Sequence, residues 1–159
     1  MKLIVCLMVM LIATKECDQN QARLSTNEST EIQNRMMQDS TKITYEATTR
    51  GFYLKLWITG DSISITQDRY LKDVSTYALS DVDKEAIYSM LNVIDETSLK
   101  DLMPPTTTFQ YDAAAMATFE IATTDKSHLT PTFDHGKPPK PIAEIVNKML
   151  SIRSEVEKQ

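Results

Sequence analysis

Hydrophobic and polar side chains alternate along residues 43–47, 52–59 and 62–66. A period of two is the pattern of a β-strand with one buried face. Arg50-Gly51 and Gly60-Asp61 separate these segments with residues that favour tight turns. The pattern therefore predicts three consecutive antiparallel strands, and residues 74–78 predict a weaker fourth strand at an edge.

A change of period after Ser80 predicts a helix from about Asp81 to Val93. Ser80 is a good N-cap, and the acidic residues that follow it favour the positive end of a helix dipole. Apolar residues then recur at the i, i+3, i+4 and i+7 positions, as expected for a helix with one buried stripe: Ile87, Met90, Leu91 and Ile94. Pro104-Pro105 ends any helical continuation.

The second half of the domain repeats the order of strands followed by a helix. Residues 115–121 have period two, and His128 to Phe133 returns as a second hairpin arm. Pro131 favours an edge position there because proline cannot donate a ladder hydrogen bond. Pro141 favours the start of a terminal helix. Grouped rather than alternating elements predict an α+β fold, with an antiparallel sheet of about five or six strands and two helices packed on one face.

The first residues predict export from the cytoplasm. Residues 3–13 form an apolar run behind Lys2, too short to span a bilayer and typical of a signal peptide. Cys17 lies where bacterial lipoproteins carry their acylated cysteine, although Glu16 stands where a small residue is usual. We expect a signal peptide at 1–16, lipidation at Cys17, a polar flexible tether at 17–41 and a single domain at 42–159. The alternative is an incidental Cys17 and a soluble secreted or periplasmic protein.

Composition disfavours several classes of function. The chain has 159 residues, 42% hydrophobic and 25% charged, as in ordinary globular proteins. A net charge of −5 without a basic cluster disfavours nucleic-acid binding. Two cysteines and two histidines cannot supply a zinc site of usual spacing. Only three glycines, and no Gly-x-Ser-x-Gly turn, disfavour a phosphate loop or a serine nucleophile. We therefore expect no metal, no cofactor and no catalytic residues.

Two groups of residues are candidates for a functional surface. Turns at one sheet end can gather a polar patch, in which Arg50 pairs with an aspartate: Arg50, Tyr111, Asp112, Asp134 and His135. The alternative is that Arg50 merely pairs with one of the aspartates and the other residues are turn formers. Tyr53 and Trp57 face away from the Leu54 and Leu56 row, so they either contact a helix or form an exposed aromatic partner surface.

Three sequence runs resemble a group of small, uncharacterised flavobacterial lipoproteins, over roughly residues 42–152. The runs are Tyr45-x-Ala47-Thr48-Thr49-Arg50-Gly51-x-Tyr53, Tyr111-Asp112-x-Ala114-Ala115 and Thr130-Pro131-x-Phe133-Asp134-His135-Gly136-x-Pro138-Pro139. That group commonly has Asp-Gly-Ala-Ala where this chain has Asp112-Ala113-Ala114-Ala115. The resemblance implies a cell-envelope location and no known activity.

A second resemblance is to emfourin-type inhibitors of thermolysin-like metallopeptidases. It is carried by Arg50, Gly51, Phe52, Asp134 and Gly136, and by the order of hairpin, helix, hairpin and final helix. The leading hypothesis is a non-enzymatic, membrane-anchored envelope lipoprotein that binds a protein or peptide through its sheet face. The alternatives are a protease inhibitor that acts through a loop and a small envelope enzyme.

Overall fold

The computed structural model describes residues 40–111 and 113–158. Its strands are β1 (Lys42–Thr49), β2 (Phe52–Thr59), β3 (Ser62–Thr66), β4 (Ser75–Ala78), β5 (Met116–Ala122), β6 (Ser127–Leu129) and β7 (Phe133–Asp134). Its α-helices are α3 (Asp81–Asn92) and α4 (Ala143–Val156), and its 3₁₀ helices are η1 (Glu96–Asp101), η2 (Thr108–Tyr111) and η3 (Lys140–Ile142). The predicted signal peptide, Cys17, Asp112 and nearly all of the predicted tether lie outside the described residues.

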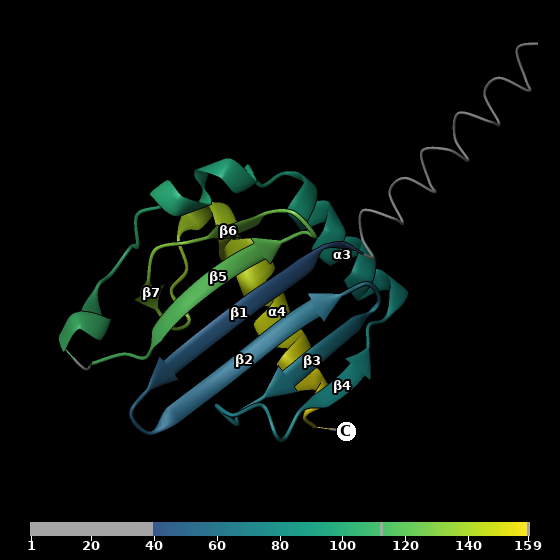
Figure 1. The fold of residues 1–159 in the computed structure, drawn as a ribbon, viewed down its shortest axis with the longest axis horizontal. Coiled ribbons are helices and arrows are strands. Elements are labelled where there is room, and N and C mark those ends of the chain that lie inside the picture. The colour runs from purple at the N-terminus through teal and green to yellow at the C-terminus, as the bar shows by residue number, and fades with distance from the viewer. Residues whose placement is uncertain (1–39, 112, 159) are drawn as a thin grey trace, which may run out of the picture. The chain divides into compact units, whose positions relative to one another are not determined.

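The described strands form one antiparallel sheet in the order β4-β3-β2-β1-β5-β6, with β7 also paired to β5 (Figure 1). The predicted α+β class is confirmed. The sheet has seven strands instead of five or six because the returning arm of the second hairpin is divided. At that division Thr130 exchanges hydrogen bonds with Phe119 through its backbone and hydroxyl, and Pro131, which lacks an N–H, separates β6 from β7.

The first hairpin pairs the first two strands that the alternating pattern predicts. Tyr45 on β1 lies opposite Leu56 on β2 and Phe119 on β5, and all three side chains are fully buried. Gly60, with φ of 59°, makes the β2–β3 turn, where a left-handed backbone favours glycine. The predicted fourth strand, β4, lies at the edge of the sheet.

Both α-helices cover the same face of the sheet, as predicted; in Figure 1 they lie behind the strands. The buried stripe of α3 consists of Ile87, Tyr88 and Leu91, and that of α4 of Ile145, Val146, Met149 and Ile152. These stripes join the inward-facing strand residues in one hydrophobic core. No α-helix covers the opposite face within the described residues, and we call that side the open face.

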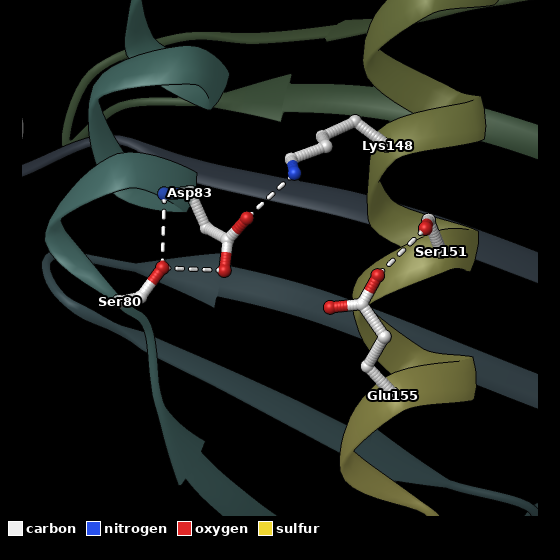
Figure 2. A network of polar contacts seen from close by, with 5 residues as sticks. All are labelled: Ser80, Asp83, Lys148, Ser151 and Glu155. Atoms are coloured by element: carbon white, nitrogen blue, oxygen red, sulfur yellow. Dashed lines mark hydrogen bonds and ion pairs between the residues drawn. The ribbon is translucent and has the colours of Figure 1, made fainter.

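A polar network fixes the start of α3 against α4 (Figure 2). The Ser80 hydroxyl accepts a hydrogen bond from the Asp83 N–H at 3.1 Å and donates one to the Asp83 carboxylate at 2.6 Å. Lys148 on α4 forms an ion pair with the other oxygen of Asp83. The bond with Lys148, and then that with Ser80, lowers the pKa of Asp83 below its usual value. The N-cap predicted at Ser80 therefore also connects the two helices.

Candidate functional site

The open face carries the two aromatic side chains that the sequence singled out. Tyr53 and Trp57 lie on β2 with Lys55 between them, and all three are partly exposed, whereas Leu54 and Leu56 are fully buried on the other side. The prediction that the aromatic pair faces away from the leucines is confirmed. Neither aromatic residue belongs to the hydrophobic core or to the partly buried side chains packed against it.

Cations lie over both aromatic rings. The Lys42 ammonium is 5.3 Å from the centre of the Trp57 ring, and the Arg69 guanidinium carbon is 5.6 Å from that of Tyr53. Both distances lie within the range of cation–π attraction. The aromatic side chains are thus held in place by long, charged side chains and are not left as bare apolar rings.

Polar side chains fill the remainder of the open face. Thr44 and Ser64 lie opposite Trp57 on the flanking strands, and both are buried although no α-helix of the described residues covers them. Lys55 and Glu46 form an ion pair at 3.0 Å. Burial alone lowers the pKa of Lys55, but its bond to Glu46 and the charge of that residue raise the pKa above its usual value. The face therefore carries fixed charges at neutral pH.

Asp134, predicted for the polar patch, is fully buried at the end of β7. Its carboxylate accepts four hydrogen bonds, with donor–acceptor distances between 2.5 and 3.0 Å, from the Thr106 hydroxyl, the Thr108 hydroxyl and N–H, and the Phe109 N–H. Burial alone raises the pKa of Asp134, but these hydrogen bonds outweigh it and hold the pKa well below its usual value. Asp134 thus fastens Thr106 and the first turn of η2 to the sheet.

His135 turns towards the core and not towards Asp134's partners. Its Nδ1 lies 2.7 Å from the Tyr45 hydroxyl, which also receives a weak hydrogen bond from the Gly136 N–H at 3.4 Å. Its ring lies 5.3 Å from that of Phe52, the first residue of β2. Burial, and then the charge of Arg153, lowers the pKa of His135. Gly136, with φ of 76°, provides the turn that places this ring.

The other patch residues do not join this cluster. Arg50 is exposed in the β1–β2 turn, and no hydrogen bond or ion pair links it to Asp134 or His135 in the described chain. Tyr111 is 81% exposed at the end of η2. Asp112, the other aspartate predicted for Arg50, lies outside the described residues. The structure therefore brings His135 to the β1–β2 turn through Phe52, while Asp134 is occupied elsewhere.

Three important residues of this region escaped the sequence analysis. Nothing in the sequence pattern gave a role to Thr106 and Thr108, and Tyr45 was placed only in an alternating strand and in one of the runs that carry a resemblance. No sequence signal pairs Tyr45 with His135, which is 90 positions away. A short threonine-rich run after Pro104-Pro105 is the one local hint of hydroxyl donors for a buried carboxylate.

The described part of the chain offers little chemistry beyond these contacts. It contains no group of three or more histidine, cysteine, aspartate or glutamate side chains that could hold a metal ion. It also contains no helix long and apolar enough to cross a membrane. Two partly open cavities, of about 270 and 200 Å³, include none of the predicted site residues.

Comparison with known proteins leaves the function to be inferred from these surfaces. No known protein family matches the chain. No curated protein matches it in sequence either.

Proposed function

We propose that this protein is a non-enzymatic lipoprotein of the cell envelope, which binds a protein or peptide partner through the open face of its sheet. The observation that carries the proposal is the pair of partly exposed aromatic side chains, Tyr53 and Trp57, on the face without α-helices. Tyrosine and tryptophan are the residue types most enriched where binding energy concentrates at protein interfaces.

The setting of these rings supports binding. Lys42 and Arg69 lie over them, so that each ring presents a cation beside an apolar surface. Thr44 and Ser64, buried on either side of Trp57, make the surrounding surface polar but compact. A partner can therefore bury aromatic area on a compact surface and also meet the two cations.

The hydrogen bonds of Asp134 and His135, two residues of the predicted polar patch, support a binding role for the protein over a catalytic one. Asp134 is saturated by hydrogen bonds within the chain, and the Nδ1 atom of His135 is occupied by Tyr45. A general acid or base must reach its substrate, whereas Asp134 is fully buried and His135 contacts Tyr45 through one of its two ring nitrogens. These contacts favour a structural role for both side chains.

The test uses Trp57, the chain's sole tryptophan, as both contact and reporter. Immobilised full-length protein is expected to retain a partner from a cell-envelope extract, and the recovered partner should shift the tryptophan emission of the free protein. Trp57→Thr, which keeps a strand-forming residue, should weaken binding about 30-fold, the effect of losing about 2 kcal/mol. Val82→Ala removes an exposed apolar side chain from α3 and is the matched control. Equal binding by Trp57→Thr and wild type would refute the proposal.

A further inference from the structure

The loop between β3 and β4 exposes several large apolar side chains at one end of the sheet. We call residues 67–74 the β3–β4 loop. Tyr70 is 79% exposed, Leu71 47% and Val74 38%. Three such side chains within five positions leave apolar surface in contact with water, which a folded domain avoids unless something covers it.

The β3–β4 loop is held rigidly in spite of this exposure. The Asp68 carboxylate accepts hydrogen bonds from the N–H groups of Tyr70 and Lys72, at 2.9 and 2.8 Å. The buried Thr66 hydroxyl accepts the Asp68 N–H, and it also donates to the carbonyl of Asp73. Side chains fixed before binding lose less conformational freedom when a partner arrives.

Leu71 is strained within this rigid loop. Its φ is 55°, and it is the sole non-glycine residue in the described chain with a positive φ. A leucine in the left-handed region carries a conformational cost that glycine would avoid. A surrounding structure that holds such a residue in place suggests that the leucine side chain itself is needed.

Arg69 joins the β3–β4 loop to the open face. Its guanidinium donates to the Thr48 hydroxyl at 2.8 Å and to the Thr49 carbonyl at 2.9 Å, and it lies over the Tyr53 ring. Arg69 therefore ties the β3–β4 loop to the part of the open face that carries Tyr53. Three side chains alone fall far short of the roughly 800 Å² per partner that a stable interface buries, and the open face can provide the remainder.

The charges of the loop favour a protein over a membrane. Arg69 and Lys72 are balanced by Asp68 and Asp73, and the whole chain carries −5. Anionic headgroups attract surfaces with an excess of basic residues, which this loop lacks. Lys72 lies 5.8 Å from the centre of the Tyr70 ring, and neither it nor Arg69 forms an ion pair within the described residues. The Asp68 carboxylate already accepts hydrogen bonds within the loop. The two cations without an ion pair therefore favour a discrete partner site with carboxylates beside an apolar pocket.

We infer that the β3–β4 loop is the anchor of the partner surface, and that Tyr70 and Leu71 insert into an apolar pocket of a protein whose rim carries carboxylates. This inference rests on the proposed function, because the same partner covers the open face. Arg69 and Lys72 then face the acidic rim of the pocket.

Site-specific photocrosslinking tests the inference on the full chain. Benzoylphenylalanine is placed at Tyr70 in the loop, at Thr59 on the open face or at Val82 on α3, and each protein is irradiated in a cell-envelope extract. Positions 70 and 59 should give the same crosslinked protein, and position 82 should not. Excess unlabelled wild type should suppress both products, whereas Leu71→Gly should compete at least tenfold less well.

The Leu71→Gly variant separates binding from folding. Glycine relieves the positive φ, so the variant should melt at the same or a higher temperature while its binding falls. Crosslinking from position 59 without position 70 would leave the proposed function standing and overturn the loop's role. Crosslinking from neither would overturn both. If the wild type co-sediments with phosphatidylglycerol vesicles and Leu71→Gly does not, the loop binds a membrane and the inference is overturned. If the crosslinked product is a dimer of the chain itself, the loop binds a second copy, and the inference is likewise overturned.

Discussion

The hydrogen bond between Tyr45 and His135 gives the sharpest prediction for the fold around the β1–β2 turn. We predict that the Tyr45 hydroxyl, which accepts a hydrogen bond from the Gly136 N–H, donates its own hydrogen to Nδ1 of His135. Burial raises the pKa of Tyr45 to about 12, although the bond from Gly136 lowers it somewhat, so the hydroxyl keeps its proton. In this arrangement His135 is neutral and carries its proton on Nε2.

Tyr45→Phe removes this hydroxyl and leaves the aromatic ring in the core. A hydrogen bond is worth about 1 kcal/mol net, and an unsatisfied buried acceptor costs about 1–3 kcal/mol. Because His135 is only partly buried, water can reach some of its surface. We expect the free energy of unfolding to fall by about 1–2 kcal/mol, measured by urea denaturation at pH 7.5.

The same variant should change how stability depends on pH. The pKa of His135 is lower in the folded than in the unfolded state, chiefly through burial and then through Arg153. The stability that neutral His135 contributes is therefore present above its unfolded pKa of about 6.5, and it is lost as the pH falls through the lower pKa of the folded state. Without the hydroxyl that favours neutral imidazole, this loss of stability below pH 6.5 should be smaller.

Nitrogen NMR of the imidazole rings provides the direct check. The chain has two histidines, so His128 on β6 serves as the reference within each sample. The wild type should show His135 protonated at Nε2, with a lower pKa than in Tyr45→Phe. A wild-type proton on Nδ1, or a stability change below about 0.3 kcal/mol, well under the value of one hydrogen bond, would refute the assignment.

Three further predictions concern other parts of the chain. Asp134→Asn has one acceptor oxygen in place of two, so hydrogen exchange should accelerate at Thr108. Because the pKa of Asp134 is depressed in the folded state, its stabilisation should begin to decline below the unfolded value of about 3.9 and be lost as the pH falls through the lower, folded value; the variant should lack this decline, as acid titration by circular dichroism will show. Lys148→Met should cost no more than about 1 kcal/mol in urea unfolding, since its ion pair is partly exposed. Cys17→Ser should release the protein from membranes that retain the wild type after high-salt washing, because an acyl anchor is apolar; equal fractionation of both proteins would exclude the lipid anchor.

The strands and helices were predictable because their signals are local. The alternation through residues 52–58 specifies one buried and one open side of β2, whatever the neighbouring strand is. Ser80 marks the start of α3 through a hydrogen bond to a residue three positions away. The division of the last hairpin into β6 and β7 was predictable only in part. Pro131 indicated an edge position, but nothing in the sequence indicated that Thr130 would bond to Phe119.

The contacts of the polar residues were not predictable, since they depend on the sheet's assembly. Asp134 meets Thr106 and Thr108 only because β7 returns beside β5. His135 meets Tyr45 across 90 positions of sequence. Aspartate, glycine and proline around these residues are also common turn formers, so composition gave no sign that one carboxylate would be fully buried.

The geometry of the sheet edges also favours face binding over strand addition. A partner strand needs a long, unpaired edge, but β4 has four residues and β6 has three, and Pro131 follows β6 closely. The open face, by contrast, continues across the central strands and places Trp57 and Tyr53 on the eight-residue β2. Lys42 and Arg69 over the rings keep this aromatic surface hydrated in the free protein. A partner that supplies carboxylates to these cations can cover the rings without leaving a buried charge unpaired.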